Sequence, residues 1–172
     1  VTFVRGRRMT DGAAISVVRE ALLDVNAQLC AALGSLAVGL AGDEIGLQAT
    51  RVSELGFVGL PVPSRPQAVL DALEQGLIPV VTPLAEGPLN VNADEAAAAL
   101  AVGLGAERSL FLTDVPGVLR DEWVVDRIHA DEADRLVEDG TFAGGIVPKL
   151  TAAVQAARQG VRAEIGATEV VA

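Results

Sequence analysis

Two asparagines and an aspartate alternate in the segment Leu89-Asn90-Val91-Asn92-Ala93-Asp94. Alternate side chains of an extended chain point to the same side, so Asn90, Asn92 and Asp94 could present two amides and a carboxylate to one ligand. The alanine-rich run 93–104 predicts a helix, and the free N–H groups of its first turn would favour an anion. The alternative is that Asn92 or Asp94 only caps this helix.

A glycine pair precedes another predicted helix, residues 148–159. Gly144 and Gly145 would let the backbone approach a bulky anion, and Pro148 suits a first helical turn. Lys149 is the only lysine among the 13 lysines and arginines. In a first turn a cation opposes the helix dipole, and this placement costs energy unless an anion is bound nearby. The pattern therefore indicates a phosphate site, although glycine followed by proline is also common in ordinary loops.

Two further segments carry candidate binding residues. In Phe3-Val4-Arg5-Gly6-Arg7-Arg8-Met9-Thr10 one arginine could bind a carboxylate through two parallel hydrogen bonds. For Arg5 and Arg7 we favour a solvated basic turn. Asp114 follows a predicted strand, 109–113, and ligands of α/β proteins usually bind at the carboxyl ends of strands. It could equally be the first residue of a β-turn.

The elements that must position these residues alternate between helix and strand, which predicts an α/β fold. Apolar residues at helical spacing predict a helix that Thr10 caps and Gly34 ends. The other predicted helices are 64–75 and 130–138. The predicted strands are 35–40, 77–81, 161–165 and 169–171, with hairpins at 47–62 and 118–125.

The composition excludes several classes of protein. With 172 residues and 51% hydrophobic residues the chain can bury a core, and no apolar run approaches the roughly 20 residues of a membrane span. The net charge of −10 disfavours nucleic acids and anionic membranes. Cys30 is interpreted as a small buried hydrophobe, and the single histidine, His129, has no neighbours that predict a metal site. These features predict a cytoplasmic protein without nucleic-acid or membrane partners.

In their order, these segments resemble acetylglutamate kinase along nearly the whole chain. The matching motifs are Phe-Val-x-Gly-x-Arg-x-Thr at 3–10, Val-Gly-Leu-x-Gly at 38–42, Glu-Leu-Gly-Phe-Val-Gly at 54–59, Asn-Val-Asn-Ala-Asp at 90–94, Leu-Thr-Asp-Val-Pro-Gly-Val at 112–118 and Gly-Gly-x-x-Pro-Lys at 144–149. The fourth and the last of these are the most specific.

The resemblance implies a three-layer α/β/α sandwich around a mainly parallel sheet, the amino-acid-kinase fold. It also implies phosphorylation of the side-chain carboxylate of N-acetyl-L-glutamate, with ATP and Mg²⁺, in arginine biosynthesis. By the same resemblance, Arg8 and Asn90 would hold the substrate carboxylate and Asn92 would lie beside it. Asp94 would organise the catalytic lysines, and Lys149 would neutralise the transferred phosphoryl group. Asp114, Gly144 and Gly145 would bind the nucleotide.

The resemblance also predicts the organisation of the chain. Residues 1–172 would form an amino-acid-kinase domain without its N-terminal phosphate-loop portion, since the family's His-Gly-Gly-Gly loop does not occur here. Its substrate side would be about 1–92 and its nucleotide side about 93–172. A homo-oligomer is expected, with the helix 11–33 as a candidate interface. The alternatives are a kinase of lysine biosynthesis that acts on carrier-protein-linked aminoadipate or glutamate, and a non-catalytic amino-acid- or nucleotide-binding relative.

Overall fold

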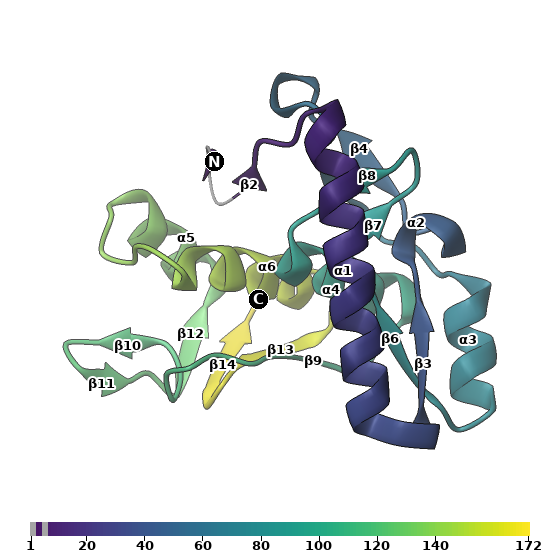
Figure 1. The fold of residues 1–172 in the computed structure, drawn as a ribbon. Coiled ribbons are helices and arrows are strands. Elements are labelled where there is room, and N and C mark those ends of the chain that lie inside the picture. The colour runs from purple at the N-terminus through teal and green to yellow at the C-terminus, as the bar shows by residue number, and fades with distance from the viewer. Residues whose placement is uncertain (1–2, 5–6) are drawn as a thin grey trace. The chain divides into compact units, whose positions relative to one another are not determined.

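The computed structural model describes residues 3–4 and 7–172, and the chain divides into two compact units, Val1–Ala96 and Ala97–Ala172 (Figure 1). The elements of the first unit, in chain order, are β1 (Phe3–Val4), β2 (Arg7–Arg8), α1 (Gly12–Leu33), η1 (Gly34–Leu36), β3 (Ala37–Leu40), α2 (Gly42–Ile45), β4 (Ala49–Arg51), η2 (Ser53–Leu55), β5 (Gly59–Pro61), α3 (Gln67–Glu74), β6 (Ile78–Val81), β7 (Leu84–Ala85) and β8 (Leu89–Asn90). Helix α4 (Ala93–Leu104) begins in this unit and continues into the second.

Helix α1 has the extent that the apolar spacing predicts, but it is capped by a different residue. The Asp11 carboxylate accepts hydrogen bonds from the backbone N–H groups of Ala13 and Ala14, at 3.0 and 2.8 Å. Thr10, the predicted cap, is instead buried, with 1% of its surface exposed. The helix ends at Gly34, which has a φ of 67° that suits glycine.

The parallel pair β3–β6 is the centre of the first unit, and both α1 and α3 contact it. Gly39 of β3 lies close against α1, because a Cβ there would lie 2.2 Å from Asn26 Oδ1. The buried Asn26 side chain donates to the carbonyl of Val80 on β6, at 2.6 Å. Glycine in the strand and a polar bond from the helix thus fix how α1 lies on the sheet.

The second unit is built on a four-stranded sheet of order β12-β14-β13-β9. Its elements after α4 are β9 (Arg108–Phe111), β10 (Leu119–Arg120), β11 (Trp123–Val124), β12 (Arg127–His129), α5 (Ala130–Glu138), α6 (Ile146–Arg158), β13 (Arg162–Ile165) and β14 (Thr168–Val171). The pairs β12–β14 and β13–β9 are parallel, and β13–β14 is antiparallel. Helix α6 contacts β9, β13 and β14, and its buried alanines join Phe111, Ile128 and Ile165 in the core.

The predicted α/β class with mainly parallel strands is confirmed, and two local predictions besides the cap of α1 are wrong. Helix α6 begins at Ile146, with Gly145 as its cap, rather than at Pro148. Proline is tolerated within the first turn because the N–H groups of that turn have no partner inside the helix. Cys30 is half-buried rather than buried, and its Sγ lies 3.7 Å from Asn26 Oδ1. Among the described residues, no helix is both long and apolar enough to span a membrane.

Candidate active-site residues

Strand β2 and the residues after it place Arg8 in the first unit. Thr10 forms a parallel bridge to Gly56, in which Thr10 N donates to Leu55 O at 3.0 Å and Phe57 N donates to Thr10 O at 2.7 Å. Gly56 has a φ of 85°, and a Cβ there would lie 2.3 Å from the Thr10 carbonyl oxygen. The glycine of the Glu-Leu-Gly motif therefore permits the close backbone contact that holds the segment leading from Arg8 into α1.

Thr10 also contacts Asn90, and the sequence did not indicate this contact. Asn90 Nδ2 donates to the Thr10 hydroxyl at 3.1 Å, and this hydroxyl donates to the Arg8 carbonyl at 3.0 Å. The Asn90 backbone N–H donates to Phe57 O at 2.9 Å. The structure thus brings together the Asn90 side chain and the backbone of Arg8.

Asn92 and Asp94 lie at the start of α4, with different surroundings. Asn92 Oδ1 accepts a hydrogen bond from Glu95 N at 3.1 Å, which makes Asn92 a helix cap, as the alternative interpretation held. Its side-chain amide N–H groups are not used in this bond. Asp94 is inside the first turn of α4, so the argument from alternate positions in an extended chain is wrong for Asp94.

Arg7 is not the solvated residue that we predicted. Its Nε donates to Glu95 Oε2 at 3.2 Å, and its Nη2 donates to Glu95 Oε1. The Glu95 side chain is only 8% exposed, and that of Arg7 is 20% exposed. Arg8 is exposed, and none of the described side chains pairs with its guanidinium. Arg5 lies outside the described residues.

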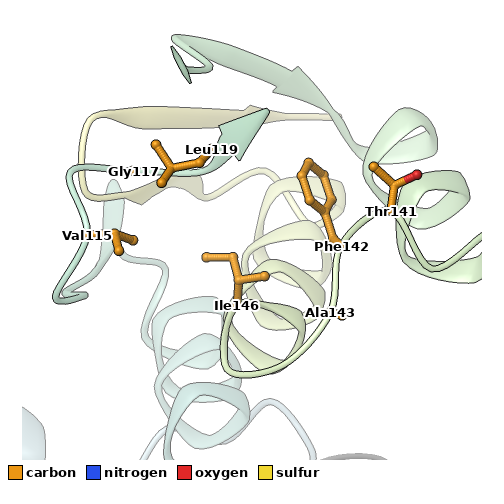
Figure 2. A pocket seen from close by; sticks show the side chains of 7 residues that line it. All are labelled: Val115, Gly117, Leu119, Thr141, Phe142, Ala143 and Ile146. Carbon is orange, nitrogen blue, oxygen red and sulfur yellow. The ribbon is translucent and has the colours of Figure 1, made fainter. Parts of the chain in front are cut away.

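The second unit contains a pocket of about 270 Å³ between the loop after β9 and the start of α6 (Figure 2). Its lining is mainly apolar and consists of Val115, Gly117, Leu119, Thr141, Phe142, Ala143 and Ile146. Predicted nucleotide-binding residues adjoin this lining in the chain, because Asp114 precedes Val115 and the pair Gly144-Gly145 precedes Ile146. An apolar slot beside a glycine pair and a helix start can accept a flat ring that carries phosphates.

Hydrogen bonds fix both walls of this pocket. Val118 N donates to the buried Thr168 hydroxyl at 2.8 Å, which ties the loop after β9 to β14. On the other wall, Thr141 N donates to Asp139 Oδ1 at 2.9 Å. Hydrogen bonds from the Thr141 hydroxyl and backbone lower the pKa of Asp139 below its ordinary value of 3.8. They therefore stabilise this turn above that pH, and their contribution is lost as the pH falls through the lower folded-state value.

Lys149 lies in the first turn of α6, as predicted, three residues after Ile146. Residues three apart lie on one side of a helix, so Lys149 follows the pocket-lining Ile146 along the same side of α6. The side chain is half-buried. The structure thus places a cation one turn after Ile146, a residue that lines the apolar pocket.

Among the described residues, no group of three or more histidine, cysteine, aspartate and glutamate side chains could hold a metal ion. Magnesium usually binds proteins through one or two carboxylates together with phosphate oxygens of the substrate. Asp114, an exposed carboxylate that adjoins the pocket lining in the chain, fits magnesium that arrives on a nucleotide.

Comparison with known proteins identifies the family to which this chain belongs. The model of the amino acid kinase family matches residues 2–166, so this chain belongs to the amino acid kinase family.

Within that family the resemblance to acetylglutamate kinase is confirmed. The acetylglutamate kinase of Roseiflexus castenholzii is 42% identical over 173 residues, which cover 94% of this chain and 67% of that protein. The chain spans 67% of the length of that protein and 58% of the length of the acetylglutamate kinase of Paracoccus denitrificans.

Solved structures share the fold of this chain. The structure of smu.665 from Streptococcus mutans superposes with a TM-score of 0.89 at 25% identity, over 99% of this chain and 77% of that one. The N-acetylglutamate synthase of Neisseria gonorrhoeae, in complex with coenzyme A and N-acetyl-glutamate, gives a TM-score of 0.80 at 25% identity. That match covers 99% of this chain and 46% of the synthase.

Proposed function

We propose that this chain belongs to an enzyme that transfers the γ-phosphoryl group of ATP to the side-chain carboxylate of N-acetyl-L-glutamate. The product is an acyl phosphate, and the reaction belongs to arginine biosynthesis in the cytoplasm. The observation that carries this proposal is the arrangement in the first unit. There Thr10 joins the Arg8 backbone to the Asn90 amide, while the Arg8 guanidinium has no partner among the described residues.

The chemistry requires no general base. A side-chain carboxylate with a pKa near ~4.3 is already ionised at neutral pH, so it can attack phosphorus directly. The remaining tasks are to hold the two reactants in line and to neutralise the charge that develops on the transferred group. Arg8, Asn90 and Asn92 would hold the substrate, and the second-unit pocket with Asp114, Gly144 and Gly145 would hold the nucleotide. Lys149 would neutralise charge, and Asp94 would organise the cations. Magnesium bound to the ATP phosphates would supply further neutralisation.

The experiment that tests the proposal measures ADP release by the full-length protein. We expect release to depend on free N-acetyl-L-glutamate and to yield a hydroxylamine-trappable acyl phosphate. Saturation by carrier-linked aminoadipate or glutamate, but not by free N-acetyl-L-glutamate, would favour the lysine-pathway alternative. Ligand binding without ADP release would favour a non-catalytic relative.

Arg8→Lys is expected to raise the KM for N-acetyl-L-glutamate by about tenfold, because lysine keeps the charge but loses the two-donor geometry. The KM for ATP should change little, since the substitution removes no nucleotide contact. Steady-state kinetics with each substrate varied in turn would measure both values. Arg5→Lys is the matched control, and an equal rise there would contradict the assignment to Arg8.

We also propose that α1 forms a contact between two copies of the chain. Its exposed apolar residues recur every fourth position, and together they form the α1 stripe: Val17, Ala21, Val25, Leu29 and Leu33. Val17 and Val25 are 65% and 51% exposed. The stripe is symmetric about Val25 and turns about 40° around the helix at each fourth position, so two antiparallel copies of α1 would cross at Val25, with Ala21 of one copy near Leu29 of the other. Self-complementarity of this kind is what a two-fold interface requires.

Val25→Arg is expected to convert the oligomer into a monomer, because it would place two like charges at the centre of an apolar contact. Light scattering at the exit of a sizing column would measure the mass. Glu20→Arg, on the side of α1 away from the stripe, is the control and should leave the mass unchanged. A mass that is the same in wild type and Val25→Arg would overturn this proposal.

A further inference from the structure

The chain on both sides of Arg8 is fastened to the segment that carries the other predicted substrate residues. On one side, Arg7 forms a two-donor ion pair with Glu95. On the other side, the Thr10 hydroxyl accepts a hydrogen bond from Asn90 and donates to the Arg8 carbonyl. Asn90 ends β8 and Glu95 lies in the first turn of α4. A short strand is therefore held against one continuous segment at two points, with Arg8 between them.

The ion pair on the Arg7 side has the geometry of a fixed anchor. Both acceptor atoms of Glu95 are used by two different nitrogens of one planar guanidinium, which restrains orientation as well as distance. Glu95 is nearly buried, and its backbone N–H is held by the Asn92 side chain. A buried carboxylate that loses its partner is strongly disfavoured, so Glu95 holds Arg7 firmly.

This anchor determines where the Arg8 side chain points. Arg7 and Arg8 are consecutive residues of β2, and consecutive side chains of a strand project to opposite faces. With Arg7 directed at α4 by Glu95, Arg8 must project from the other face of the strand, where it is exposed. A guanidinium whose backbone is held in place loses less conformational freedom when it binds a carboxylate than one on a mobile backbone.

We propose that Arg7 and Glu95 are positioning residues that preorganise Arg8 for the carboxylate of an acylated amino acid, the substrate class of the proposed function on which this inference rests. They do not contact the substrate. Their effect passes through Arg8, so it falls on the binding of the carboxylate substrate and not on ATP.

A double-mutant cycle on the full-length protein tests this. Arg7→Gln is expected to raise the KM for the carboxylate substrate on the order of tenfold, since small misplacements of a binding group cost up to 10²-fold. The KM for ATP should not change. In an Arg8→Ala background, the same Arg7→Gln substitution should have almost no further effect. Arg7→Lys keeps a cation opposite Glu95 but loses the fork, so it should show a smaller rise and provides a second variant if Arg7→Gln unfolds.

The control is Arg19→Gln, which removes another ion pair of the first unit, that with Asp43 and Glu44. It should leave the KM for the carboxylate substrate unchanged, and thermal unfolding of each variant would show any general loss of stability. If Arg7→Gln or Arg7→Lys raises KM by the same factor with and without Arg8, or not at all, the proposal is overturned. An unchanged KM in Arg8→Ala alone would instead contradict the proposed role of Arg8.

Discussion

Lys149→Ala is expected to lower kcat by about 10²-fold or more while the protein remains folded. A preorganised cation that meets charge as it develops in the transition state typically contributes a factor of this size. Lys149 stands in the first turn of α6, one turn beyond the pocket residue Ile146. Steady-state kinetics together with thermal unfolding would measure the loss of rate and the retention of structure.

The control for this variant is Arg158→Ala at the other end of α6. Arg158 is exposed and forms ion pairs with Asp131 and Asp134, so its removal changes the charge of the same helix away from the pocket. We expect kcat within a few-fold of wild type for Arg158→Ala. A similarly small change for Lys149→Ala would show that Lys149 has no role in the chemical step.

Asp94→Asn is expected to reduce kcat strongly without removing an acidic limb from the pH profile. Asparagine keeps the shape of the side chain but not the charge that would organise the cations around the phosphoryl group. Because the substrate carboxylate ionises before it binds, no proton has to be abstracted from it. The pH dependence of kcat/KM, measured in wild type and variant, separates an organising charge from a general base.

Two outcomes would contradict this view of Asp94. The first is a limb near neutral pH in the wild type that disappears in Asp94→Asn, which would identify a base. The second is an equal loss of rate in Asp24→Asn, an exposed carboxylate on α1, which would show that the effect follows net charge and not position.

Local pattern predicted most of the elements in both units. The extents of α4 and α5 agree with the predicted 93–104 and 130–138, because alanine content and helical spacing of apolar residues are local properties. The start of α1 was misplaced by one residue. Thr10 and Asp11 are both good caps in isolation, and only the tertiary burial of Thr10 excludes it. Capping preferences depend on local sequence and therefore cannot predict that Thr10 is buried by tertiary contacts.

The roles of the site residues stay predictions. Their surroundings in the structure show contacts that a sequence motif does not reveal. The motif at 3–10 contains Thr10 as well as Arg8, but Thr10 was predicted only to cap a helix and not to link Arg8 with Asn90. Thr10 and Asn90 are 80 residues apart in the chain, and Arg7 and Glu95 are 88 apart. No local periodicity links positions at such separations. Arg7 therefore looked like a solvated basic residue, although it shares two hydrogen bonds with a nearly buried carboxylate.

The strand order of the second unit constrains how this unit folds during synthesis. Strand β14 follows β9, β12 and β13 in the chain, but it lies between β12 and β13 in the sheet. A nascent chain that has reached Ile165 can pair β13 with β9, whereas β12 still lacks its parallel neighbour. Until residues 168–171 emerge, Ile128 of β12, which is fully buried in the finished unit, has an open strand edge beside it. That unpaired edge is the surface that chaperones and proteases would meet on a nascent chain that has emerged from the ribosome only as far as the turn at Gly166.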